Sequence, residues 1–136
     1  MSYLIDTNVC IALINGTSTR ARRRYAQAGA DPDLPCISSI VAHELWYGVA
    51  KSTRVVQNAN RLATFLNLAV SVLDYTERDA QAAGEIRADL ERRGERIGEY
   101  NTLIAGQAFA RNLILVTANT REFRKVKGLV VEDWTA

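Results

Sequence analysis

Four polar side chains stand where a parallel sheet would bring them together. Asp6 and Asn119 each follow a short apolar run that is expected to form a strand. Glu44 and Asn101 lie near the beginning of expected helices. Sites in open parallel sheets form beyond the carboxyl ends of the strands. We therefore expect these four residues, far apart in sequence, to meet at one end of the sheet.

Oxygen ligands of this kind are suited to metal-assisted chemistry. Crowded carboxylates repel one another, and a bound cation relieves the repulsion. Hard oxygen donors without Cys or His favour Mg²⁺ or Mn²⁺ over Zn²⁺. Such an ion orients and activates an attacking water and neutralises charge on a phosphate. The residue types therefore predict hydrolysis of a phosphodiester bond.

Each of the four residues also has a purely structural interpretation. Asp6 and Asn101 are good helix caps, Asn119 suits a turn, and Glu44 stands beside an apolar stripe at a core boundary. Spacing alone leaves these alternatives open. A Ser–His–Asp site would need His43, the only histidine. Because no nucleophile elbow is present, we expect His43 to pack or to line a cleft.

The composition is that of one ordinary globular domain spanning residues 1–136. The apolar fraction is 48%, and the formal net charge is +2. No apolar run is long enough to span a membrane, and the first residues lack the pattern of a signal peptide. Two cysteines, Cys10 and Cys36, are expected to be reduced and buried, so we expect a cytoplasmic protein. Basic residues gather in three clusters, at 20–24, 92–96 and 121–127, which favour nucleic acid as a ligand.

Strand and helix patterns alternate along the chain. This alternation predicts an α/β sandwich with a mostly parallel central sheet. A capping box is expected at Thr76 to Asp79, and Val55, Ala59, Leu62 and Leu66 are expected to form one helix face. The expected strands are 3–5, 34–37, 70–73, 113–117 and 129–131. The expected helices are 9–14, 20–30, a helix after Ser38 or Ser39, 53–69, 76–93 and 99–111, with a turn at 31–33.

Four motifs, in order and covering nearly the whole chain, resemble the PIN-domain toxins called VapC. They read YLIDTN at 3–8, SIVAHELWYGVAK at 39–51, RIGEYNTLIAGQA at 96–108 and LVTANTREFRKV at 115–126. The resemblance implies a PIN-like α/β/α sandwich and a site in which Asp6 and Glu44 are metal ligands.

One position departs from the family pattern. The third motif normally carries Asp where this chain has Asn101, and an amide binds a hard cation less well than a carboxylate. Asn119 is common in this subgroup. The resemblance thus implies a Mg²⁺ or Mn²⁺ site built from Asp6, Glu44 and Asn101, with Asn119 as a further catalytic residue. Glu85 and Glu122 are candidate helpers.

The resemblance also implies a biological setting. VapC-like proteins are endoribonuclease toxins that cleave structured RNA such as transfer RNA and are blocked by a cognate antitoxin. A homodimer and a larger toxin–antitoxin assembly are expected. The antitoxin would insert a segment along the active-site groove, for which the helices within 53–93 are a candidate docking wall. Trp46 and Tyr47 are expected either to pack against a partner or to lie in the core.

Three other interpretations compete with this one. A haloacid-dehalogenase phosphatase would need a second Asp at position 8, where the chain has Asn8. A dehydrogenase would need a Gly-rich turn after the first strand, which is missing. The third alternative is a catalytically dead PIN fold that only binds its antitoxin or RNA, and Asn101 keeps it open.

Overall fold

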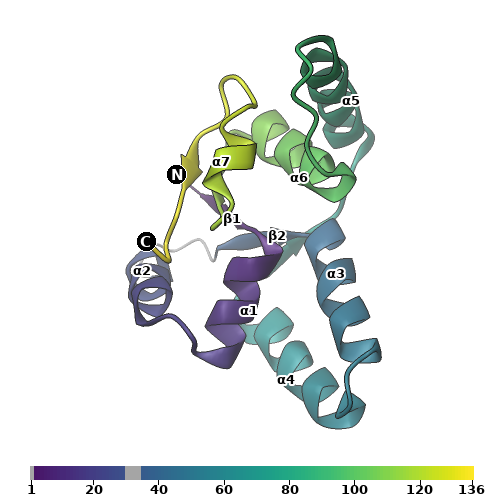
Figure 1. Ribbon diagram of the computed structural model, residues 1–136. Helices are drawn as coiled ribbons and strands as arrows, with labels where there is room; N and C mark the ends of the chain where they lie inside the picture. Colours follow the sequence, from purple (N-terminus) through teal and green to yellow (C-terminus); the bar gives the residue numbers. More distant parts are fainter. Residues whose placement is uncertain (1, 30–34) are drawn as a thin grey trace.

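A sheet of five parallel strands forms the centre of the protein (Figure 1). The computed structural model describes residues 2–29 and 35–136. The strand order is β3-β2-β1-β4-β5, and every pairing among these strands is parallel. The strands are β1 (Tyr3–Ile5), β2 (Cys36–Ser38), β3 (Ser71–Leu73), β4 (Ile114–Val116) and β5 (Val131–Glu132).

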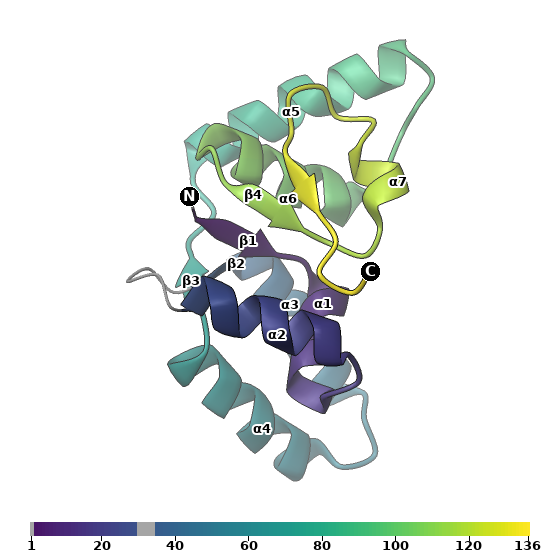
Figure 2. The ribbon, with the colours of Figure 1, turned by 90° about the vertical axis from the view of Figure 1, so that its left-hand side faces the viewer.

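Helices cover both faces of this sheet. The first four helices lie on one side and the last three on the other (Figures 1 and 2). The expected α/β/α sandwich with a parallel sheet is therefore confirmed. The helices are α1 (Thr7–Asn15), α2 (Thr19–Gly29), α3 (Ser39–Ala50), α4 (Val55–Leu68), α5 (Glu77–Arg92), α6 (Glu99–Ala110) and α7 (Thr120–Phe123).

The order of the strands creates a switch point at the middle of the sheet. From β1 the chain moves outward to β2 and β3, and then it returns to place β4 on the other side of β1. Helices that follow β1 and helices that follow β4 therefore leave in opposite directions. A crevice opens at the carboxyl ends of such neighbouring strands. Asp6 directly follows β1 and Thr117 directly follows β4 at this crevice.

Some sequence expectations differ from the structure. The short helix α7 was not expected, because four residues are too few to display a helical period. The last strand is Val131–Glu132 rather than 129–131. Val55, expected on a buried face, is 44% exposed because it lies in the first turn of α4, whose buried residue is Leu62. The expected turn at 31–33 lies outside the described residues. No helix in the described ranges is both long and apolar enough to cross a membrane.

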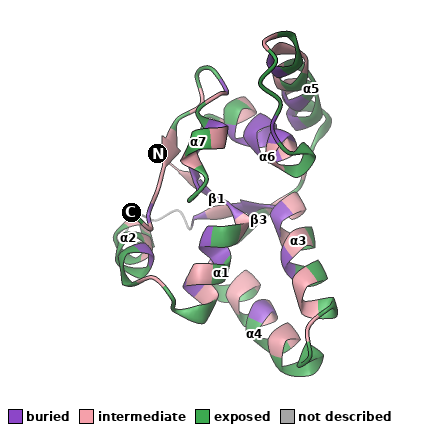
Figure 3. Ribbon diagram, viewed as in Figure 1, coloured by how far each residue is buried: buried purple, intermediate pink, exposed green. Residues whose placement is uncertain are grey.

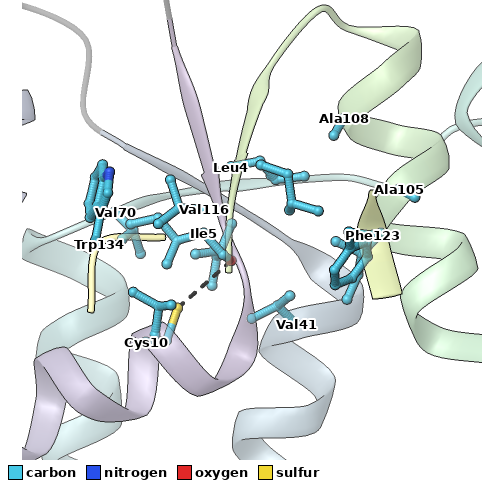
Figure 4. Packing of buried hydrophobic residues seen from close by; sticks show 14 of the residues in the cluster. Leu4, Ile5, Cys10, Val41, Val70, Ala105, Ala108, Val116, Phe123 and Trp134 are labelled. Atoms are coloured by element: carbon cyan, nitrogen blue, oxygen red, sulfur yellow. Dashed lines mark hydrogen bonds between the residues drawn. The ribbon is translucent and has the colours of Figure 1, made fainter. Parts of the chain in front are cut away.

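The core lies between the sheet and the inward faces of the helices (Figure 3). Leu4, Ile5 and Val116 on the two central strands have no solvent exposure. Around them pack side chains from both helical layers (Figure 4). Cys10 is buried and its thiol donates to the Ile5 carbonyl at 3.9 Å, whereas Cys36 is only half-buried.

An ion pair between a buried carboxylate and a half-buried guanidinium joins the beginning of α5 to the end of α6. Asp79, 1% exposed, accepts hydrogen bonds from Arg111 at 2.9 Å and from Gln107 at 3.0 Å. It also completes the expected capping box by accepting from the Thr76 amide at 2.9 Å. Burial opposes ionisation, but these hydrogen bonds outweigh it and lower the pKa of Asp79 to about 2. The carboxylate therefore stays charged and holds the two helices together.

Close contact between α5 and α6 requires glycine at position 106. A Cβ built on Gly106 would lie 2.7 Å from the backbone of Ala83. We expect Gly106→Ala to lower the free energy of unfolding by about 1–3 kcal/mol, the usual range for overpacking. Gly84 on α5 has nothing within 4 Å of its built Cβ and is the matched control. Gly84→Ala should leave stability unchanged or raise it by up to about 1 kcal/mol. Urea unfolding of both variants checks this, and equal stabilities would contradict the packing argument.

Candidate active site

Asp6 lies directly after β1, at the carboxyl end of the central strand. Its side chain caps α1: one carboxylate oxygen accepts from the Thr7 amide at 2.8 Å. The other accepts from the Thr117 hydroxyl at 2.8 Å. The backbone amide of Asp6 donates to the Val116 carbonyl at 2.8 Å, which fixes it to β4. With only 5% of its surface exposed, Asp6 is held in one orientation by both central strands.

The surroundings of Asp6 disfavour its ionised form. Burial is the largest influence and raises the pKa of Asp6 above its ordinary value. Hydrogen bonds from Thr117 and Thr7 act in the opposite direction, and the negative charge of Glu122 raises the pKa further. A carboxylate in this position gains from a nearby cation, because the cation offsets both the burial and the repulsion.

Glu44 approaches Asp6 from the first half of α3. This helix begins at Ser38, whose hydroxyl oxygen accepts from the Ile40 amide at 3.1 Å. The Thr7 hydroxyl donates to Glu44 at 2.8 Å. Since the amide of the same threonine donates to Asp6, Thr7 connects the two acids directly. Glu44 is half-buried, so its carboxylate lies at the edge of the crevice rather than beneath it.

Glu122, on the short helix α7, connects the remaining residues of the site. One of its carboxylate oxygens accepts from the Gly98 amide at 2.7 Å, and the other accepts from the Asn119 side chain at 2.6 Å. The Asn101 side chain also donates to it. The Gly98 amide is the largest cause of a lowered pKa for Glu122, and the two asparagines add to it. Glu122 is therefore a stable negative charge within the electrostatic range of Asp6.

The structure thus brings the four predicted residues to one crevice as two connected groups. Thr7 joins Asp6 to Glu44, and Glu122 joins Asn101 to Asn119. Glu122, predicted only as a helper, supplies the third carboxylate. Two residues that sequence reasoning missed are Thr7 and Thr117, although Thr7 lies within the first motif.

Glu85 has no comparable place. It is exposed on α5, and within the described ranges no hydrogen bond or ion pair involves it. Neither does it line the cavities described between the helices. Nothing in the geometry connects it to the two groups.

An apolar groove runs beside Glu44. Its volume is about 250 Å³, and α1, α3 and α4 form its walls. Glu44 lines the groove next to the apolar side chains of Leu45 and Val49. On the same helix Trp46 and Tyr47 are 41% and 59% exposed, so the expectation that they lie in the core is wrong. The groove-lining residues are Ile11, Ile14, Asn15, Glu44, Leu45, Gly48, Val49, Asn58, Arg61 and Leu62.

Comparison with known proteins identifies the family. The PIN domain matches residues 3–129. The tRNA(fMet)-specific endonuclease VapC of Shigella flexneri is 39% identical over 99% of both chains. Its counterpart in Salmonella typhimurium is 38% identical over 98% of both. The chain belongs to the VapC family of PIN-domain proteins.

Solved structures of the VapC family share this fold. A structure of VapBC2 from Rickettsia felis bound to a DNA fragment from its promoter superimposes with a TM-score of 0.90 at 36% identity. The match covers 98% of this chain and 99% of that one. DNA-bound VapBC from Salmonella typhimurium also gives a TM-score of 0.90, at 38% identity and 98% coverage of both chains.

PIN-domain ribonucleases depend on a divalent metal ion, and the donors of this crevice fit one. Asp6, Glu44 and Glu122 offer only hard carboxylate oxygens, the type that Mg²⁺ and Mn²⁺ prefer. Each oxygen that accepts one hydrogen bond keeps a further lone pair. Among residues 2–29 and 35–136, no three Asp, Glu, His or Cys side chains lie together closely enough to hold a metal ion. An ion bound here would therefore have few protein ligands and would keep several of its own waters.

Manganese binding tests this arrangement without any RNA. We expect saturable Mn²⁺ binding, measured by calorimetry or by electron paramagnetic resonance. Asp6→Asn and Glu122→Gln should each weaken it at least ten-fold. At an effective dielectric constant of about 20, one charge about 4 Å from the ion contributes on the order of 4 kcal/mol.

The control for this titration is Glu85→Gln. It removes the same charge from an exposed position outside the crevice and should leave Mn²⁺ affinity unchanged. Equal losses in all three variants would mean that net charge, rather than the crevice, attracts the ion.

Proposed function

We propose that this protein is a metal-dependent endoribonuclease toxin of a bacterial toxin–antitoxin pair, hydrolysing phosphodiester bonds in structured RNA such as transfer RNA. The observation that carries the proposal is the set of three carboxylates at the switch point between β1 and β4. The Shigella flexneri relative, which matches this chain from end to end, is a tRNA(fMet)-specific endonuclease. Because transfer RNA is cytoplasmic, we place the protein in the cytoplasm.

The proposed ion is Mg²⁺ or Mn²⁺, with Asp6, Glu44 and Asn101 as its expected ligands and Glu122 as a further negative charge nearby. When bound, it would supply activation of water and neutralisation of charge on the phosphate. The protein contributes orientation. Thr117 and the Thr7 amide fix both oxygens of Asp6, while the Gly98 amide and Asn119 fix those of Glu122. Such preorganised groups need no rearrangement when RNA arrives.

Two of the three basic clusters are available to RNA phosphates. Arg20 and Arg23 on α2 are exposed and have no ion-pair partner among the described residues. Arg121 and Arg124, beside Glu122, are also exposed. In the middle cluster, by contrast, Arg93 is engaged by Asp89, Glu95 and the Lys125 carbonyl. Exposed cations flanking an acidic crevice would hold the RNA backbone while a phosphate enters.

Asn101 is the position at which this chain departs from the family pattern. Its neutral amide lies against Glu122, where the family resemblance leads us to expect Asp. We expect the unchanged chain to be weakly active or inactive. Asn101→Asp should raise metal-dependent cleavage of transfer RNA at least ten-fold, because it adds a charge beside the ion. Electrophoresis of the RNA, with Mg²⁺ and then with chelator, measures the gain.

Adding Asp6→Asn to the Asn101→Asp variant should abolish its activity again. If the unchanged chain already cuts as fast as Asn101→Asp, position 101 does not belong to the metal site. If neither form cuts while both stay folded, the alternative is favoured: a catalytically dead PIN fold that binds antitoxin or RNA.

We further propose that a small antitoxin occupies the apolar groove beside Glu44, and that a cationic side chain of the antitoxin reaches Glu44 or Asp6. Buried and half-buried acids favour such a plug. The structures of relatives described above are VapBC complexes. The expectation that both helices within 53–93 form the docking surface for the antitoxin is wrong. These helices, α4 and α5, lie at opposite ends of the molecule (Figures 1 and 2). Only α4 lines the groove, together with α1 and α3. A homodimer, and a larger assembly with the antitoxin, remain part of this proposal.

Coexpression with the neighbouring gene tests the partner. We expect the chain to purify together with a small DNA-binding protein encoded beside it. Ile11 is 41% exposed and lines the groove, so Ile11→Glu should abolish the complex. Val56 is 77% exposed on α4 and does not line it, so Val56→Glu should retain the complex. Failure of the unchanged chain to bring down any such partner would count against the toxin–antitoxin proposal.

A further inference from the structure

Two aromatic rings lie side by side between helices α3 and α6. His43 belongs to α3 and Tyr100 to α6, and their ring centroids are 5.8 Å apart at an interplanar angle of 53°. The His43 Nε2 atom lies 3.5 Å from the Tyr100 hydroxyl. Figure 1 shows the beginning of α6 directly above the beginning of α3. The two rings therefore bridge the helices that carry Glu44 and Asn101.

Neither ring serves the core. Tyr100 is 49% exposed and His43 is also exposed. The buried contacts of α3 come from Val41 and Leu45 instead, one on each side of His43. In sequence His43 immediately precedes Glu44, and Tyr100 immediately precedes Asn101. Their position calls for an explanation outside folding stability.

We propose that His43 and Tyr100 form a stacking surface for an unpaired nucleobase beside the phosphate that is cut. This inference rests on the proposed ribonuclease function. Protein rings commonly hold splayed-out RNA bases by stacking on them, and stacking tolerates any base because each has a π-face. A neutral base can also approach the three carboxylates, whereas additional phosphates would be repelled by them.

The exposed face of α3 extends this surface and could bind further nucleotides of a single-stranded RNA. His43 and Tyr47 are four residues apart on α3, which places them on one side of the helix, and Lys51 is the C-cap residue that follows it. The Lys51 ammonium lies 4.7 Å from the centroid of the Tyr47 ring. An aromatic row that ends in a cation combines base stacking with attraction for the RNA backbone. This surface therefore fits an RNA strand better than an apolar partner.

RNA binding measured in the presence of a metal chelator separates base stacking from cleavage, because the proposed cleavage needs a metal ion. The probe is a single-stranded RNA oligonucleotide that carries 2-aminopurine, whose fluorescence falls when the base stacks. We expect the unchanged protein to bind and quench it. Tyr100→Leu should lose most of the quenching and bind about ten-fold more weakly, in the range found for one stacked base. Tyr100→Phe keeps the ring and should retain both properties.

The matched control lies at the far end of the same helix. Phe109 is 46% exposed on α6 and belongs to neither the crevice nor the ring pair. Phe109→Leu should leave quenching and affinity unchanged. Circular dichroism of every variant checks that the fold is intact.

Each remaining outcome counts against the proposal in a distinct way. If Tyr100→Leu quenches and binds like the unchanged protein, stacking is wrong while the ribonuclease function stands. If, in addition, this variant loses a dimer in size-exclusion chromatography, the rings belong to an interface between two copies. If the unchanged protein does not bind this oligonucleotide, the stacking proposal fails, whereas the proposed function is decided separately by the transfer RNA cleavage assay.

Discussion

The rest of this structure depends on the hydrogen bonds that a buried carboxylate needs at the end of the central strand. Asp6 is almost completely buried, and a buried charge is tolerated only when it is hydrogen-bonded or paired. The Thr7 amide and the Thr117 hydroxyl occupy its two oxygens, so β1, α1 and β4 must all end or begin at this point. The parallel sheet, with its reversal of direction between β1 and β4, is the arrangement that brings these three termini together.

The site is stabilised by neighbours that have opposite effects on its acids. Burial and a nearby negative charge make Asp6 reluctant to ionise, whereas backbone and amide donors keep Glu122 ionised. Asn101 is one of the donors that keep Glu122 ionised, because its amide donates a hydrogen bond to Glu122 and an aspartate could not. A neutral amide at position 101 thus adds no negative charge to the site and, at the same time, connects α6 to α7.

The sequence predicted the elements whose signals are local and strong. The apolar runs ending at Asp6 and Thr117, the Ser38 cap and the Thr76 capping box all form as expected. Convergence of Asp6 and Glu44 also followed from the rule for parallel sheets. The importance of Glu122 did not, because it depends on α7, which has four residues and no side-chain cap. The threonine contacts to Asp6 and Glu44 were equally out of reach, since they join residues far apart in sequence.

The double role of Asp6 restricts which substitutions the protein tolerates at this position. As the cap of α1, Asp6 supports the fold as well as the chemistry, and losing a cap typically costs about 1 kcal/mol. Asn or Ser at this position could still cap the helix, whereas most other substitutions would lower stability as well as activity. The residue at position 101 caps no helix in this way, and the amide of Asn101 forms a hydrogen bond with Glu122. An amide at position 101 therefore disturbs the fold less than most substitutions at position 6 would.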